Sequence, residues 1–353
     1  MHAHSMTRIA IIGAGMAGLA TAYGLRTLPV DVTVFEKSRG YGGRVATRGR
    51  QGARYDHGAN YFTAPTPRLR RLITAHLPTD GLLQISRSIW SFEADGTLCR
   101  PDPDEEGEER WTYRQGINRL GKLLAQQSGA TVRTETPIQR VFYRENTWTC
   151  ESSTSSYSDF DALVLTPPAP QTAEILSASR VGAETLRRMQ QGLNAVSYTS
   201  QFSFVFGYDR VLSRPGPFYG LRSADGEHPI QWIGFEHEKP GHVRSGHSVL
   251  VVQTAPGWTA ERLEQEPVEF VHEVKEYVED ILISDLRHPA WYDAQKWRYA
   301  RPRSAMTGDM GTERAEYGLF LAGDYVAGVG RVAAALESGI QAAEEIRDWY
   351  DDA

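Results

Sequence analysis

The chain has 353 residues, enough for two domains or one large divided domain, and its 41% of hydrophobic and 23% of charged residues are ordinary for a globular protein. With 38 Lys and Arg against 44 Asp and Glu, the formal net charge is −6, which argues against nucleic acid as the main partner because phosphate contacts need clustered positive charge. Only two cysteines occur, Cys99 and Cys150, which excludes a disulfide framework, and neither has the spacing of a zinc site.

No stretch of the sequence has the length and composition of a transmembrane helix. Residues 9–25 are the longest weakly polar run, but four glycines interrupt it and no convincing signal-peptide cleavage site follows. Residues 1–5 are expected to be an extension ahead of Met6 that lies outside the fold. We therefore expect a cytoplasmic protein without a membrane partner, and a monomer as the default state.

The first forty residues carry the clearest local pattern. Residues 7–12 form a short apolar run typical of a buried parallel strand, and the motif GxGxxG, a helical pattern and a second strand at 32–35 follow it. In this motif the first glycine permits a tight turn, the second lets the backbone approach a pyrophosphate, and the third lets the helix pack on the strand. An acid at the end of the second strand is placed to bind a ribose. The predicted dinucleotide contacts here are Gly13, Gly15, Met16, Ala17, Gly18, Glu36 and Lys37.

The residues after Glu36 distinguish FAD from NAD. Residues 39–44 read RGYGGR, which resembles the second glycine motif of the flavin amine oxidase superfamily. The resemblance implies that Gly42, Gly43 and Arg44 lie along the pyrophosphate and the isoalloxazine of FAD. The other interpretation is a basic, flexible loop without a ligand.

The far end of the chain carries a second motif of the same superfamily. Residues 317–324 read as a strand that leads into Gly-Asp, and residues 331–343 read as a helix. The resemblance implies that Gly323 and Asp324 bind the ribityl or phosphate part of FAD, and that the backbone at Arg331, Val332 and Ala333 points at the flavin pyrimidine. Many relatives have Glu-Gly where this chain has Ala-Ala at 333–334, so a side-chain role of that glutamate is absent. A buried aspartate that caps a helix is the alternative.

These motifs predict an α/β fold with a discontinuous Rossmann-like FAD-binding domain of the glutathione reductase or p-hydroxybenzoate hydroxylase type. Strand-like runs near 130–141 and 161–166 are assigned to it, with Val141 at the adenine and Thr166 near the middle of the FAD by the same resemblance. The expected boundaries are 6–62, 115–175 and 290–353 for the FAD-binding domain, and 63–114 and 176–289 for the substrate domain.

The middle of the chain has a different pattern. Residues 196–208, 228–237 and 248–255 are strand-like with partial alternation, which predicts an antiparallel sheet. Residues 266–282 place valines and an isoleucine at helical spacing and predict an amphipathic helix. We expect an α+β substrate domain that covers the flavin, with an acidic, solvated loop at 101–109.

The whole chain from about Met6 resembles the renalase family, closest to its bacterial members. Residues 56–64 resemble the segment D-x-G-A-Q-Y-F-T-A of that family, with Asn60 in place of glutamine, and residues 195–200, 295–298 and 299–302 match further stretches. The resemblance adds Ala59, Asn60, Tyr61 and Phe62 to the expected contacts of FAD. It implies that FAD, held non-covalently, takes hydride from 2- or 6-dihydro isomers of NAD(P)H and passes the electrons to O2, with NAD(P)+ and H2O2 as products.

This reaction needs no general base from the protein, because the nitrogen of a dihydropyridine already drives the loss of hydride. The protein must bind the ring flat and exclude water, for which aromatic walls are suited. The aromatic candidates are Tyr61, Phe62, Trp232, Trp297 and Tyr299, each of which is equally compatible with core packing. Arg298 and Arg301 are candidates for a substrate phosphate or carboxamide, with a surface ion pair as the alternative.

Other functions remain open. The chain is compatible with a flavin amine oxidase, with a desaturase of a lipid-like substrate, and with a non-catalytic FAD-binding scaffold. The two flavin motifs disfavour an NAD-dependent dehydrogenase. No GxSxG motif occurs, which argues against a serine nucleophile of the α/β-hydrolase type. The five-residue spacing of His237, His242 and His247 does not suit a metal-binding helix, so we predict no metal.

Overall fold

The computed structural model describes residues 6–101, 107–177, 179, 183–307 and 317–352. The extension at 1–5 lies outside the described residues, as does most of the acidic loop expected at 101–109. None of the helices in these ranges combines the length and the apolar composition that crossing a bilayer requires.

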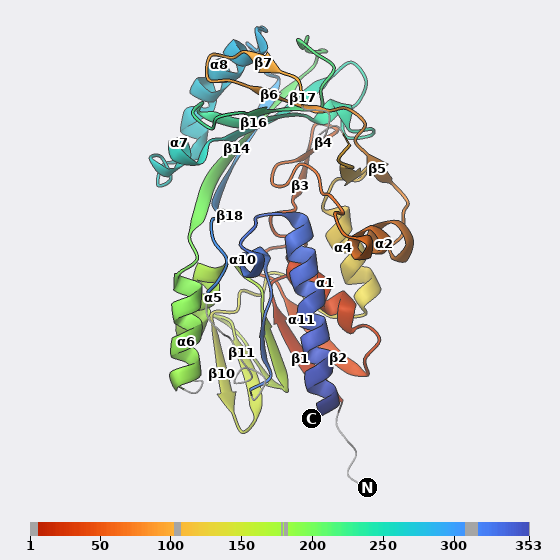
Figure 1. Ribbon diagram of the computed structural model, residues 1–353, viewed down its shortest axis with the longest axis vertical. Coiled ribbons are helices and arrows are strands. Elements are labelled where there is room, and N and C mark those ends of the chain that lie inside the picture. Colours follow the sequence, from red (N-terminus) through yellow and green to blue (C-terminus); the bar gives the residue numbers. More distant parts are fainter. Residues whose placement is uncertain (1–5, 102–106, 178, 180–182, 308–316, 353) are drawn as a thin grey trace.

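A five-stranded parallel sheet forms the lower body of the molecule (Figure 1). Its spatial order is β19 (Leu319–Leu321), β13 (Ala162–Leu165), β1 (Thr7–Ile12), β2 (Val30–Phe35) and β9 (Thr131–Arg133). Ile9 and Ile11 pack into one hydrophobic cluster and Ala10 and Ile12 into another, so β1 is buried on both faces. That burial explains the unbroken apolar run in its sequence.

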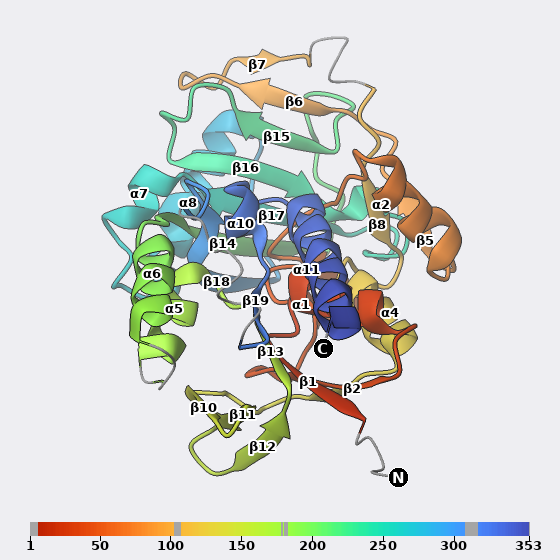
Figure 2. The ribbon, with the colours of Figure 1, turned by 60° about the horizontal axis from the view of Figure 1, so that its bottom comes forward.

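The first and last helices of the chain pack against each other over one face of this sheet (Figures 1 and 2). They are α1 (Met16–Leu25) and α11 (Val332–Asp352). A Cβ on Gly339 of α11 would lie 2.2 Å from the Ala17 carbonyl oxygen, and Thr21 Oγ1 donates a hydrogen bond to the Gly339 carbonyl at 3.0 Å. Helix α4 (Arg119–Ser128) packs beside α1. The predicted discontinuous Rossmann-like fold is thus confirmed.

A seven-stranded, largely antiparallel sheet forms the upper body, and Figure 2 shows its strands in order. They are β18 (Trp291–Pro302), β14 (Tyr198–Tyr208), β17 (Ser248–Thr254), β16 (Ile230–Phe235), β15 (Gly220–Ser223), β6 (Ile89–Phe92) and β7 (Leu98–Cys99). Helix α8 (Val271–Leu282) packs its valines into the hydrophobic cluster that also contains the phenylalanines of β14, as its helical spacing predicted. The single-turn helices α7 (Pro256–Ala260) and η3 (Pro267–Phe270) lie beside the same sheet.

The smaller elements connect the two bodies or flank the parallel sheet. The flanking strands are β10 (Arg140–Arg144), β11 (Thr147–Glu151) and β12 (Ser156–Phe160), and helices α5 (Ala169–Ser177) and α6 (Ala183–Asn194) follow β13. The connecting elements are β3 (Thr47–Arg50), β4 (Ala53–Asp56), α2 (Pro67–Arg71), η1 (Leu72–His76), β5 (Leu82–Gln84), β8 (Trp111–Tyr113), η2 (Glu236–Glu238) and α10 (Asp324–Ala327).

Two segments pack with the other domain than the one to which the expected domain boundaries assign them. A boundary at residue 290 assigns β18 to the FAD-binding domain, but β18 pairs with β14 along its length and belongs to the seven-stranded sheet. Residues 67–77 were expected in the substrate domain, but Leu69, Leu72 and Ile73 pack into the cluster that contains α1 and α11. The rest of the division into domains stays a prediction.

Candidate functional site

A cavity of about 1490 Å³ lies between the glycine-rich loops of the lower body and the seven-stranded sheet. It exceeds the ~300–1000 Å³ of a pocket for one small ligand, so it has room for a dinucleotide and a second molecule. Its walls come from the loop between β1 and α1, the loop after β2, strand β18, and the start of α10 and α11.

The loop between β1 and α1 has the geometry of a phosphate cradle. Gly13 has a φ of +104°, and a Cβ on Gly18 would lie 2.0 Å from the Gly13 carbonyl oxygen, so both positions require glycine. Thr166 Oγ1 donates to the Ile12 carbonyl at 2.8 Å and fixes β13 against the loop. Among the described residues, a Cβ on Gly15 would meet no atom within 4 Å, and no side chain caps the start of α1. This open space beside free backbone N–H groups is where a diphosphate fits.

Glu36 lies at the end of β2, as the motif predicts. Its carboxylate accepts hydrogen bonds from the backbone N–H groups of Ala14 and Ser38, both at 2.8 Å. These two bonds orient the carboxylate in the cavity wall and leave lone pairs on its oxygens for a ribose diol.

Arg44 and Asp324 join the two ends of the chain. The Arg44 guanidinium forms a bidentate pair with the Asp324 carboxylate, with both hydrogen bonds at 2.9 Å. Arg44 also donates to the carbonyls of Tyr299 and Ala300, where β18 bulges away from its register with β14. Much of the charge of Arg44 is therefore balanced inside the protein, whereas the family resemblance implied that Arg44 lies along FAD.

Aromatic rings line the part of the cavity under the sheet. The rings of Tyr61 and Trp232 lie 6.1 Å apart, and Trp297 stacks on His57 with a centroid distance of 5.3 Å and an interplanar angle of 21°. The indole N–H of Trp297 donates to the His57 carbonyl at 3.1 Å. Burial, together with the charge of Arg48, lowers the pKa of His57 to about 4, so this ring is neutral at physiological pH.

Most of the predicted site residues line this one cavity. Those from the cofactor motifs are Gly13, Gly15, Met16, Ala17, Glu36, Lys37, Gly42, Gly43, Arg44, Ala59, Asn60, Thr166, Gly323, Asp324, Arg331 and Val332. Those predicted for the substrate are Tyr61, Trp232, Trp297, Arg298, Tyr299 and Arg301.

Four predicted residues lie outside the lining: Gly18, Phe62, Val141 and Ala333. Gly18 and Ala333 pack inside the helices that border the cavity. Phe62 is 1% exposed and stacks on Tyr113, and Val141 is fully buried opposite Cys150 in the β10–β11 pair. Arg298 borders the cavity, but Glu264 binds its guanidinium in a bidentate pair at 2.8 and 3.0 Å.

A set of glutamines in the wall was not predicted from the sequence: Gln201, Gln231, Gln253 and Gln295. Gln253 is nearly buried and donates from Nε2 to the Gly58 carbonyl at 2.7 Å, which fixes the loop ahead of Asn60. A signal for three of them was present, since Gln201, Gln231 and Gln253 each interrupt an apolar run of a predicted strand.

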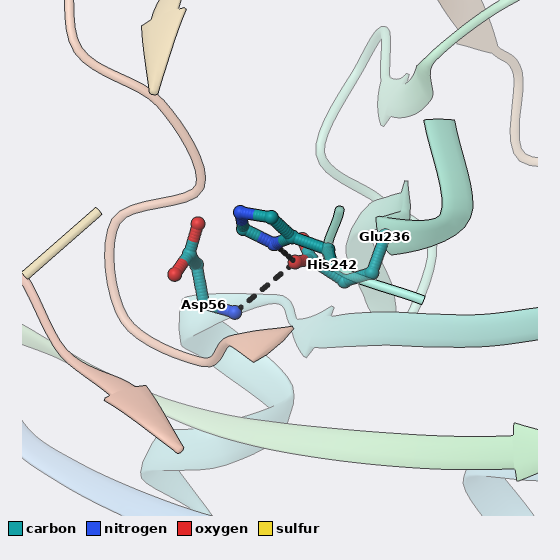
Figure 3. Close-up of side chains that lie close together, drawn as sticks. All are labelled: Asp56, Glu236 and His242. Carbon is teal, nitrogen blue, oxygen red and sulfur yellow. Dashed lines mark hydrogen bonds and ion pairs between the residues drawn. The ribbon is translucent and has the colours of Figure 1, made fainter. Parts of the chain in front are cut away.

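Asp56, Glu236 and His242 form a buried group whose spacing would suit a metal ion, and Figure 3 shows their side chains converging. The Lys239 ammonium already lies between the two carboxylates, 2.8 Å from Asp56 and 2.7 Å from Glu236. Burial alone would raise the pKa of Asp56, but the charges of Lys239 and His242 outweigh burial and lower it. This group is therefore an internally balanced ionic cluster, which does not favour a metal.

Comparisons with known proteins agree with this geometry. The family model for flavin containing amine oxidoreductases matches residues 83–347, and the model for an NAD(P)-binding Rossmann-like domain matches residues 11–75. Renalase of Mus musculus is 26% identical over 313 residues, which cover 86% of this chain and 87% of the mouse protein.

Solved structures share the fold. Cyclohexylamine oxidase from Brevibacterium oxydans superposes with a TM-score of 0.72 at 13% identity and covers 98% of this chain and 100% of its own. Putrescine oxidase with bound putrescine superposes with a TM-score of 0.70 at 15% identity and covers 97% of this chain and 99% of its own.

The fold, the glycine cradle and the paired Arg44 and Asp324 define an FAD-dependent oxidoreductase. The open space at Gly15 and the glycines with positive φ at 42 and 43 fit the dinucleotide part of this cofactor. The chain belongs to the family of flavin containing amine oxidoreductases, and within that superfamily it is a renalase-like member.

Proposed function

We propose that this protein is an oxidase of misreduced nicotinamide dinucleotides, in which hydride is on C2 or C6 of the ring instead of C4. The balanced reaction converts the dihydro isomer, O2 and one proton into NAD(P)+ and H2O2. When bound, FAD supplies the acceptor of the hydride and returns two electrons to O2. The product is the ordinary coenzyme, so the reaction is a repair of metabolite damage.

The observation that carries this proposal is the aromatic wall. Tyr61, Trp232, Trp297 and Tyr299 border the same cavity as the cofactor motifs and provide flat, apolar surfaces for a planar ring. A hydrogen bond orients one of these surfaces, since the indole N–H of Trp297 donates to the His57 carbonyl. Such a wall positions a ring and excludes water, which is the main contribution a protein makes to hydride transfer.

The chemistry of the lining also supports a substrate that needs no base. In the described part of the chain, no histidine and no cysteine lines the cavity. Of the four carboxylates in the lining, those of Glu36 and Asp324 accept hydrogen bonds from the protein itself. Glu108 is paired with Arg110, and Glu174 is exposed to solvent. A dihydropyridine releases hydride without losing a proton to the enzyme, so this lining suits it. The same lining favours non-covalent FAD.

We further propose roles for the residues that hold FAD. The backbone at Gly13, Gly15 and the start of α1 binds the diphosphate, and Glu36 binds the ribose of the adenosine. Gly42, Gly43 and the pair of Arg44 with Asp324 border the flavin half. The N-terminus of α11 at Val332 provides backbone N–H groups and a positive dipole for the pyrimidine ring of the flavin.

Anaerobic mixing of the yellow protein with candidate donors tests the proposal. The 2-dihydro and 6-dihydro isomers of NAD and NADP, ordinary NADH, and a simple primary amine are compared by loss of the oxidised-flavin absorbance. We expect rapid bleaching by at least one isomer, with NAD(P)+ as product and peroxide after air is admitted. Bleaching by the amine alone would indicate an amine oxidase, and no bleaching by any isomer would refute the repair function.

A further inference from the structure

Among the described residues, two arginines of the cavity wall, Arg301 and Arg331, have no counter-charge. Neither guanidinium forms an ion pair or a hydrogen bond with another residue in the described part of the chain, and both are exposed because the cavity beside them is open. Three other cations of the same wall are paired with carboxylates. Arg44 is paired with Asp324, Lys296 with Glu266, and Arg298 with Glu264.

The two arginines are held close together by the backbone between the last strand and the last helix. A Cβ on Gly330 would lie 2.7 Å from Arg301 Cβ, so only glycine lets the chain ahead of Arg331 approach the stem of Arg301 this closely. Surrounding protein and the charge of Arg331 lower the pKa of Arg301, while nearby Tyr61 acts in the opposite direction. The two charges therefore repel each other at a point beside the aromatic wall.

An anion relieves this repulsion. Guanidinium groups bind phosphate oxygens bidentately, and a concave wall of one charge sign attracts ligands of the opposite sign. The same two charges repel a protonated amine. Since the cradle at Gly13–Gly18 and α1 provides for the phosphates of FAD, the arginine pair is left for the second molecule in the cavity.

We propose that Arg301 and Arg331 form the subsite that binds the diphosphate of the dinucleotide substrate, next to the aromatic wall that receives its dihydronicotinamide ring. This inference rests on the proposed function and adds to it the residues that select a dinucleotide over a free nicotinamide or an amine. The pair is a specificity-determining element and takes no part in hydride transfer itself.

The variants Arg301→Gln and Arg331→Gln test this subsite. The preferred dihydro isomer is supplied as the dinucleotide and as the corresponding nicotinamide riboside, which lacks phosphate. For each variant we expect the concentration that gives half-maximal bleaching to rise about tenfold or more for the dinucleotide, and less than about twofold for the riboside.

Arg287→Gln serves as the control, because it removes the same charge from an exposed ion pair with Asp285. We expect the half-maximal concentrations of both the dinucleotide and the riboside to be unchanged in this variant.

Three results would overturn the assignment. An equal loss with dinucleotide and riboside would mean that the arginines shape the site without binding phosphate. Loss of FAD from both variants, with an unchanged melting temperature of the apoprotein, would mean that the pair binds the cofactor. Unchanged values with both donors would mean that the pair binds neither.

Binding of ADP-ribose separates this inference from the proposed function, because ADP-ribose has the diphosphate without a reducible ring. We expect it to perturb the flavin spectrum of the wild-type protein, with an affinity about tenfold weaker in Arg301→Gln. If no isomer bleaches the flavin but ADP-ribose still binds the wild type more tightly than Arg301→Gln, the proposed repair function is refuted and the anion subsite is supported. If ADP-ribose binds both proteins equally, the subsite fails whatever the substrate.

Discussion

At the scale of single residues, Gly15 separates cofactor binding from folding. A Cβ at this position meets no atom of the protein within 4 Å, so Gly15→Ala is expected to change the free energy of unfolding of the apoprotein by less than ~0.5 kcal/mol. The same methyl group occupies the cradle in which the diphosphate would lie. We expect the affinity for FAD to fall about tenfold or more, measured by titration of the apoprotein.

Gly257 provides the matched control. A Cβ there also meets no atom within 4 Å, but Gly257 lies in α7, outside the cavity lining. Gly257→Ala should therefore bind FAD as the wild-type protein does. If Gly15→Ala also retained full affinity, the backbone of this loop would not face the cofactor.

The motif glycines and Glu36 were predictable from sequence because their roles depend on local backbone geometry. Gly13 needs its positive φ, Gly18 its close approach, and Glu36 its place two residues before the N–H of Ser38. Arg301 was a candidate for a substrate phosphate from the sequence, but the lack of a counter-charge on Arg301 and Arg331 was not predictable. Whether an arginine is paired depends on carboxylates such as Glu264, which is 34 residues away from Arg298 in the chain.

At the scale of elements, the Arg44–Asp324 pair connects three segments. It ties the loop after β2 to the start of α10 and, through two carbonyls, to the bulge of β18. Asp324 is only 4% exposed and the Arg44 side chain is 32% exposed, so Asp324→Asn leaves a partly buried guanidinium without its counter-charge. We expect the holoprotein to lose about 2 kcal/mol of stability or more, measured by urea unfolding, together with weaker FAD binding.

Glu264→Gln is the control for this change. Glu264 also binds an arginine bidentately, but its side chain is exposed to solvent, so screening by water leaves the pair with little net effect. We expect no measurable change in the urea midpoint. An equally small effect of Asp324→Asn would show that the buried pair does not connect the segments energetically.

The elements with a clear local sequence pattern were predicted well, and the placement of others was not. β1, α1 and β2 have patterns that local burial produces, and α8 has its valines at helical spacing. The membership of β18 was wrong because strand pairing is a long-range choice. Its partner β14 lies about 90 residues earlier in the chain, and the sequence around residue 290 does not indicate with which sheet β18 pairs.

At the scale of the whole molecule, the buried ionic cluster joins distant parts of the chain. Asp56 ends β4 and accepts hydrogen bonds from Thr47 Oγ1 at 2.7 Å and from the Ile117 N–H at 3.0 Å. His242 contacts Glu236 through Nδ1 and the Tyr113 carbonyl through Nε2, both at 2.9 Å. Both ring nitrogens of His242 face oxygen acceptors, so a doubly protonated ring satisfies both, and with two carboxylates and one ammonium such a cluster is neutral.

The pH dependence of the unfolding free energy should show whether His242 is protonated in this cluster. Burial alone would lower the pKa of His242, but the hydrogen bond and charge of Glu236 outweigh it, so the pKa in the folded protein is raised above 6.5. The stabilisation from protonated His242 is therefore complete below pH 6.5 and is lost as the pH rises through the raised pKa. We expect the difference in unfolding free energy between wild type and His242→Gln to shrink from pH 6 to pH 9.

His57 should give the opposite trend in the same urea-unfolding experiment. Its pKa is lowered to about 4 in the folded protein, so the neutral ring stabilises the fold fully above pH 6.5, and this contribution is lost as the pH falls towards 4. The difference between wild type and His57→Asn should therefore shrink from pH 7 to pH 4.5. Two buried histidines with opposite slopes would identify the charge state of each, because a general loss of packing would lower stability equally at every pH. A pH-independent difference for His242→Gln would mean that the ring is neutral in the cluster and that Lys239 alone balances the two carboxylates.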